Sequence, residues 1–126
     1  ATLFKILIPF FKNNKNLRRL DISGCTMNDE CTRKLILALS VCNDLKQIEF
    51  NSIEMHGDRT GELVTMLSRN RNLIKVSLAE NHIARIGCVA LGHLLVNPMT
   101  KLKELDLSGN HIDNEGAIAL ANALVK

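Results

Sequence analysis

The segment Leu102–Leu124, LKELDLSGNHIDNEGAIALANAL, decides the fold of this chain. Its first half reads L-x-x-L-x-L, and the alternation at its end is typical of a short strand with one buried face. Its second half reads G-x-x-x-L-x-x-x-L from Gly116 to Leu124, and a spacing of four places both leucines on one face of a helix. The segment therefore predicts a strand followed by a helix.

The same pattern occurs four times along the chain. It begins at Leu17, Leu45, Leu73 and Leu102, so successive starts are 28, 28 and 29 residues apart. A fixed period of this length predicts a solenoid of stacked units, each of which buries its apolar face against its neighbours. We expect a single domain, residues 1–126, made of the repeats 17–44, 45–72, 73–101 and 102–126, with residues 1–16 forming the helix of a preceding partial repeat.

A second column of polar residues follows the strands. Asn81 and Asn110 occupy equivalent positions of the third and fourth units, where Cys25 and Ile53 stand in the first two. A buried amide here can bond backbone groups of neighbouring coils that would otherwise lack a partner. We therefore expect a ladder of amide hydrogen bonds that is interrupted at Ile53 and weak at Cys25.

With its period of 28–29 residues and its full helix, the chain resembles the leucine-rich repeats of the ribonuclease-inhibitor type. The resemblance covers nearly the whole chain. It implies an α/β fold, a right-handed β/α horseshoe with a parallel sheet on the concave side and helices on the convex side. Because this subtype is mostly intracellular, the resemblance also implies a cytoplasmic location. Pro9 falls inside the expected first helix and predicts that it is irregular.

Composition narrows the function. Hydrophobic residues make up 46% of the 126, which suits one folded domain, and no apolar run approaches the roughly 18 residues of a membrane span. We expect no membrane insertion. The four cysteines form no C-x-x-C pair and are expected to be free thiols in a reducing compartment. The chain lacks a nucleophile elbow, a phosphate-binding loop and a dinucleotide fingerprint, so we expect no enzyme activity and no cofactor.

Histidines and acids gather where strands lead into helices. His82 and His111 share a column with Glu54, while His56 and Asp113 share another. Imidazoles and carboxylates can bind zinc, but these spacings match no known ligand motif. We expect a solvated polar edge and no physiological metal site.

Charges separate onto the two rims of the predicted solenoid. Acids dominate where strands lead into helices, and bases dominate where helices lead into strands. Acids near helix N-termini and bases near C-termini complement the helix dipole, which explains the separation without a function. Alternatively, the basic rim attracts an acidic partner surface. Nucleic acid is not an expected partner, because aromatic residues are only 3% of the chain and Trp and Tyr are absent. The candidate basic-rim residues are Arg18, Arg69, Arg71, Lys101 and Lys103.

The outward-facing strand positions form the candidate binding surface, which is small, polar and mixed in charge. We expect a non-enzymatic protein-recognition module whose partner is another protein that the sequence does not identify. The resemblance also leaves open a regulator of a partner enzyme, of the GTPase-activating or inhibitor type. A third possibility is a structural spacer that makes contacts through uncapped solenoid ends. The candidate partner-binding residues are Arg19, Asp21, Gln47, Glu49, Lys75, Ser77, Glu104 and Asp106.

Overall fold

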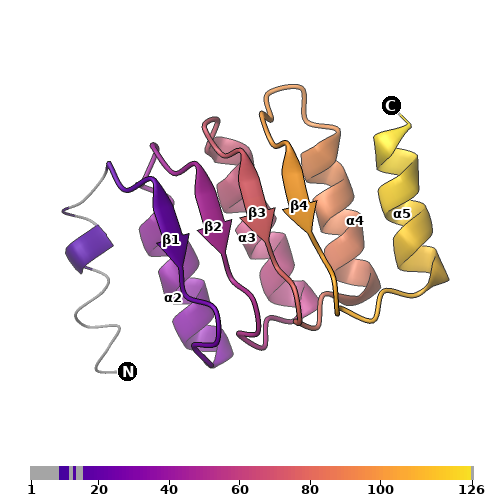
Figure 1. Ribbon diagram of the computed structural model, residues 1–126, viewed down its shortest axis with the longest axis horizontal. Helices are drawn as coiled ribbons and strands as arrows, with labels where there is room; N and C mark the ends of the chain where they lie inside the picture. The colour runs from indigo at the N-terminus through magenta and orange to yellow at the C-terminus, as the bar shows by residue number, and fades with distance from the viewer. Residues whose placement is uncertain (1–8, 12, 14–15, 126) are drawn as a thin grey trace.

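In the computed structural model, strands and helices alternate along the chain (Figure 1). The structure describes residues 9–11, 13 and 16–125, and residues 9–11 and 13 are helical. Most of the helix predicted over residues 1–16 thus lies outside the described residues. The elements are β1 (Arg19–Asp21), α2 (Asp29–Leu39), β2 (Gln47–Glu49), α3 (Gly57–Arg69), β3 (Lys75–Ser77), α4 (Ala84–Leu95), β4 (Glu104–Asp106) and α5 (Asn114–Leu124).

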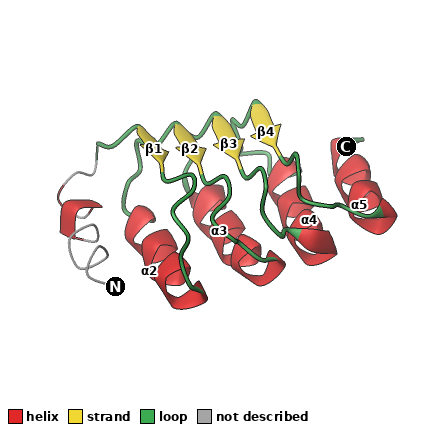
Figure 2. Cartoon of the chain, turned by 60° about the horizontal axis from the view of Figure 1, so that its bottom comes forward, coloured by secondary structure: helices red, strands yellow, loops and turns green. Residues whose placement is uncertain are grey.

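The strands form one parallel sheet in the order β1-β2-β3-β4. Their register follows the sequence period, since Leu20 pairs with Ile48, Ile48 with Val76, and Val76 with Leu105. Helices α2 to α5 lie on the same face of the sheet, and they are spaced more widely than the strands (Figure 2). The stack therefore curves with the sheet on its inner side, and the predicted α/β solenoid is confirmed.

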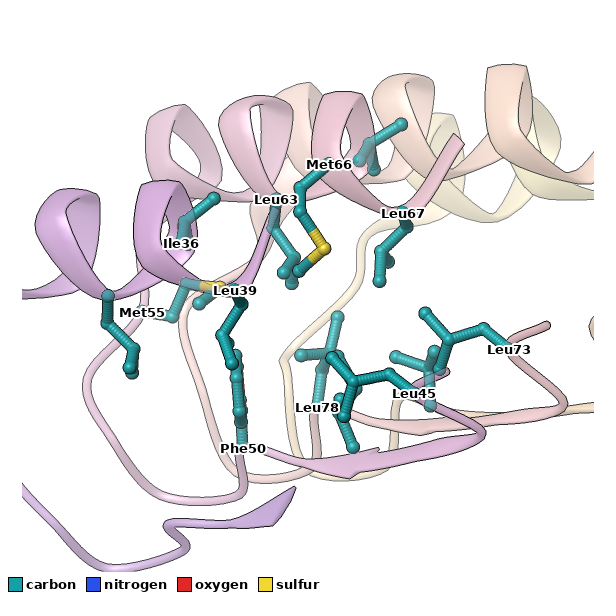
Figure 3. Packing of buried hydrophobic residues seen from close by; sticks show 14 of the residues in the cluster. Ile36, Leu39, Leu45, Phe50, Met55, Leu63, Met66, Leu67, Leu73 and Leu78 are labelled. Carbon is teal, nitrogen blue, oxygen red and sulfur yellow. The ribbon is translucent and has the colours of Figure 1, made fainter. Parts of the chain in front are cut away.

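The hydrophobic core fills the space between the sheet and the helices (Figure 3). Leu45, Phe50, Leu63 and Leu78 are fully buried there. The last unit is less protected, because leucines of its strand segment such as Leu105 are only partly buried. Burial in this fold thus depends on having a neighbouring unit on each side.

The predicted amide ladder is present in the third and fourth units. Asn81 Oδ1 accepts hydrogen bonds from the backbone N–H groups of Ile53 and Met55, at 3.1 and 3.0 Å. Its Nδ2 donates to the carbonyls of Phe50 and Leu78, at 2.8 and 3.0 Å. Asn110 repeats the arrangement one unit later, accepting from Asn81 N at 3.2 Å and Ile83 N at 3.3 Å.

The ladder stops at Ile53, as predicted. The Ile53 side chain is buried and apolar, so it offers no amide to the preceding unit. The backbone there finds another partner, because the N–H of Cys25 donates to the carbonyl of Ile22 at 3.0 Å. Cys25 itself is exposed and does not continue the ladder.

Each strand leaves the sheet through a left-handed residue. Gly24 and Gly109 have φ of 80° and 69°, and the equivalent positions Ser52 and Glu80 have φ of 55° and 56°. Only glycine adopts this conformation without a steric penalty from Cβ. The two glycine-containing turns therefore match their geometry better than the two between them.

Candidate protein-interaction surface

The outward strand residues form two columns that cross the open face of the sheet. Pairing in register places Arg19, Gln47, Lys75 and Glu104 in one column. The same register places Asp21, Glu49, Ser77 and Asp106 in the other. The outermost members of both columns are exposed, and Gln47, Glu49 and Lys75 are half-buried. The structure thus places the eight predicted residues on the strands of one sheet, in two neighbouring columns.

Ser77 differs from the other seven residues because it is only 5% exposed. Its hydroxyl donates to Asn51 Oδ1 at 2.6 Å, and the same oxygen accepts from Ala79 N at 2.8 Å. Asn51 therefore organises the ends of β2 and β3. It is not among the eight partner-binding residues predicted from the sequence. Its position just after β2 was the available signal.

Charged groups on this face pair with one another across the strands. Arg19 donates to Glu49 Oε2 at 3.0 Å, and Gln47 Nε2 donates to Glu49 Oε1 at 2.8 Å. Lys75 Nζ lies 3.6 Å from Glu104 Oε2. The hydrogen bond and charge of Glu49 raise the pKa of Arg19. The surface is therefore an ordered set of paired charges at neutral pH.

Two aspartates close turns at the sheet edge. Asp21 accepts from the backbone N–H of Ser23 at 2.9 Å, and hydrogen bonds from Ser23 lower the pKa of Asp21. Asp106 accepts from the hydroxyl and the N–H of Ser108, at 2.7 and 2.9 Å, and these bonds lower its pKa. Both carboxylates are thereby held ionised on the candidate surface.

The basic-rim residues lie where the helices lead into the strands. All five side chains are exposed, and they make no ion pair with any residue in the described part of the chain: Arg18, Arg69, Arg71, Lys101 and Lys103. Their positive charge is thus available to solvent or to a partner.

At the opposite rim, acids stand at helix N-termini. Asn28 Oδ1 accepts from Cys31 N, and Asp113 Oδ1 accepts from Gly116 N, both at 2.8 Å. Asp29, Glu30, Asp58 and Glu115 lie in first helical turns. Because these helices are parallel, the dipole explanation accounts for this acidic rim.

Histidines at this rim are arranged differently from the prediction. The structure pairs His82 with His56 in an isolated parallel bridge, whereas the sequence alignment set His82 beside Glu54. The two imidazole rings stack with their centroids 5.0 Å apart. Glu54, two residues before His56, has left-handed backbone with φ of 59°. Among residues 9–11, 13 and 16–125, no three His, Cys, Asp or Glu side chains come together as metal ligands.

Apolar surface is exposed in a groove between two helices and in a groove on the last unit. A groove of about 380 Å³ lies between α2 and α3, and one of about 370 Å³ lies at the end of the stack, lined in part by Leu102, Leu105 and Leu120. The expected contacts through the solenoid ends stay a prediction. No helix in the described ranges is long and apolar enough to cross a membrane.

Comparison with known proteins finds similarity to leucine-rich repeats. A family model described as "Leucine Rich repeat" matches residues 13–30 and 99–121. The protein "NACHT, LRR and PYD domains-containing protein 9" of Bos taurus is 28% identical over 108 residues, which is 84% of this chain. The chain spans only 10% of the length of that relative.

Solved structures agree on the fold. The structure named "Leiomodin-1 Actin-Binding Site 2 (ABS2)" has a TM-score of 0.84 at 19% identity, covering 98% of this chain and 73% of the other. The tropomodulin C-terminal domain of Caenorhabditis elegans has a TM-score of 0.78 at 13% identity, covering 96% and 75%. The fold of this chain is therefore the α/β solenoid of leucine-rich repeats. The narrower ribonuclease-inhibitor subtype stays a prediction.

Proposed function

We propose that this chain recognises a protein partner, without catalysis, through the open face of its sheet. The observation that carries the proposal is the register of the strands, which aligns charged side chains into two adjacent columns. Helices cover the opposite face, so this face alone presents the strand side chains to a partner. The proposed contact residues are Arg19, Asp21, Gln47, Glu49, Lys75, Glu104 and Asp106, with Ser77 and Asn51 holding the surface in shape.

The chemistry of the face favours a polar partner surface. Arg19 and Asp21 lie at one side of the sheet, and Glu104 and Asp106 lie at the other. Aromatic side chains, which anchor many tight interfaces, do not occur at these positions. The partner should therefore present alternating charges, and binding should weaken as salt rises.

The defining experiment is an affinity capture from native lysate, read by mass spectrometry at low and at physiological salt. Actin is included as a defined probe, because the leiomodin-1 structure is named for an actin-binding site. The variants Glu49→Lys and Lys75→Glu reverse charges within the columns. Lys34→Glu makes the same change on α2, away from the sheet, and serves as the matched control.

We expect Glu49→Lys or Lys75→Glu to remove a specific partner that Lys34→Glu retains. A partner that binds equally to all three variants would show that recognition occurs elsewhere. If the wild-type chain captures no partner beyond copies of itself, the sheet face is not a recognition surface.

We also propose a reducing, intracellular location for the chain. Its four cysteines are free, with Cys42 and Cys88 buried in the core and Cys25 exposed. Burial raises the pKa of the Cys42 and Cys88 thiols, so both stay protonated and unreactive at neutral pH. Localisation of the tagged full-length protein by microscopy tests this assignment.

A further inference from the structure

A surface groove on the helical side of the molecule runs between α2 and α3. This groove has a volume of about 380 Å³, and an equivalent groove between α4 and α5 has about 200 Å³. The larger groove is lined by Arg33, Ile36 and Leu37 from α2, by its C-cap residue Ser40, and by Glu62, Thr65, Met66 and Arg69 from α3. Nothing in the proposed sheet-face function uses these residues.

The sequence explains the difference in volume between the two grooves. At the α4–α5 contact, Gly92 faces α5 so closely that an added Cβ would lie 3.4 Å from the Ala119 carbonyl oxygen and 3.5 Å from Ala123 Cβ. Two units earlier, the position of Gly92 is occupied by Ile36. The positions of Ala119 and Ala123 are occupied by Glu62 and Met66. Larger side chains hold α2 and α3 apart, and the groove results.

The floor of the groove is apolar. Ile36 and Met66 are 3% and 4% exposed, while Leu37 projects at the lip with 64% of its surface exposed. The two hydroxyl groups of the lining are already engaged within their own helices. Ser40 Oγ donates to the Leu37 carbonyl at 2.6 Å, and Thr65 Oγ1 donates to the Gly61 carbonyl at 3.1 Å. A ligand therefore meets a hydrophobic surface that is large enough for one or two side chains.

The charge of the groove is positive. Glu62 is the acid among the lining residues, and its carboxylate is shared by Arg59 at 2.6 Å and Arg33 at 3.4 Å. Arg69, at the other end of the groove, is exposed and has no ion-pair partner within the described ranges. In the α4–α5 groove, the position of Arg33 is occupied by Val89. The excess of guanidinium groups is thus specific to the α2–α3 groove.

We propose that the α2–α3 groove binds an acidic peptide segment of a partner protein. An apolar side chain of the segment lies over Ile36 and Met66, and a carboxylate pairs with Arg69. Arginine suits this role because its planar guanidinium can hold a carboxylate through two hydrogen bonds. The basic rim by itself would attract any acidic segment. The groove adds an apolar contact, so it selects acidic segments that also carry an apolar side chain.

The test uses a displayed library of random twelve-residue peptides, selected on the 126-residue chain at physiological salt. We expect the enriched peptides to combine Leu, Ile, Phe or Met with neighbouring Asp or Glu. Arg69→Glu and Leu37→Glu should each weaken the best peptide by at least about tenfold, because each places a carboxylate beside the bound segment. Binding should fall with rising salt.

Two matched variants separate the groove from its surroundings. Arg71→Glu reverses an exposed charge two residues beyond Arg69 but outside the lining, and His93→Glu alters the position that corresponds to Leu37 in the α4–α5 groove. Both should retain binding to within about twofold. Thermal melts of all four variants confirm that each is folded.

Three results would overturn the proposal. The first is a library that yields no enriched peptide, and the second is a set of enriched peptides that lack acids. The third result is an equal loss of peptide affinity for Arg69→Glu and Arg71→Glu, which would show attraction by the rim alone. Concentration-dependent sedimentation that Leu37→Glu abolishes would instead assign the groove to a second copy of this chain. Glu49→Lys, on the sheet face, should leave peptide binding unchanged, so this test is independent of the proposed recognition function.

Discussion

Replacing Asn81 should remove a large share of the stability of the solenoid. Its side chain is buried at 1% exposure, and its Oδ1 accepts hydrogen bonds from the N–H groups of Ile53 and Met55. Both of those residues are also buried, so Asn81→Ala leaves two backbone donors without a partner and without water. Each such donor costs about 1–3 kcal/mol, which gives about 2–6 kcal/mol for the pair. The total free energy of unfolding of a natural domain is about 5–15 kcal/mol.

The assay is urea denaturation followed by far-ultraviolet circular dichroism at 25 °C. With a slope of about 1–3 kcal/mol per molar urea, a loss of about 2–6 kcal/mol should lower the midpoint of Asn81→Ala by at least about 0.7 M. The midpoint of Asn81→Leu, which keeps the branched shape but removes the amide, should fall similarly, whereas that of Asn122→Ala, on the exposed side of α5, should not. A midpoint for Asn81→Ala within about 0.3 M of wild type would refute the reasoning.

Three further predictions concern other layers of the structure. Leu78→Ala should cost about 2–5 kcal/mol because Leu78 is fully buried, and Leu107→Ala, at the equivalent but half-buried position of the last unit, should cost roughly half as much in the same denaturation assay. Gly109→Ala should cost about 1–2 kcal/mol because φ is 69° and the Glu80 carboxylate occupies the space of a Cβ, while Ser52→Gly, at φ 55°, should raise the melting temperature. Ser108→Ala should raise the pKa of Asp106, measured by NMR titration of the carboxyl carbon, towards the ordinary value of about 3.9. Because Ser108 lowers the folded-state pKa, its stabilising contribution is present above that ordinary value and is lost as pH falls through the lower folded-state pKa.

The sequence predicted the sheet register because the repeat period leaves no choice of pairing. The strand leucines must face the core in every unit, so a shift by one residue would expose them all. The amide ladder was equally predictable, since Asn81 and Asn110 occupy one column and Ile53 breaks it. Local turns were harder to predict, because the repeat columns placed Glu54 beside His82, whereas the structure pairs His56 with His82.

The candidate surfaces were only partly predictable, for reasons that involve more than one unit. Ser77 was expected to face a partner, but its hydroxyl donates to Asn51, just after the neighbouring strand β2, and the residue is buried. The α2–α3 groove depends on comparing side-chain sizes between aligned helices, where Ile36 replaces the small Gly92. Periodicity reports which residues face the core, but it does not report how far apart two helices lie.

The paired charges on the sheet face are compatible with recognition of a partner. The Arg19–Glu49 and Lys75–Glu104 pairs each include a side chain that is more than half exposed, at 62% for Arg19 and 66% for Glu104. Exposed pairs of this kind contribute about 0–1 kcal/mol, so a partner can replace them at small cost. The pairs also hold long side chains in defined positions before binding, which lowers the entropy lost on association. The arrangement therefore favours selection by charge pattern, and a partner that matches the alternation gains affinity without deforming the solenoid.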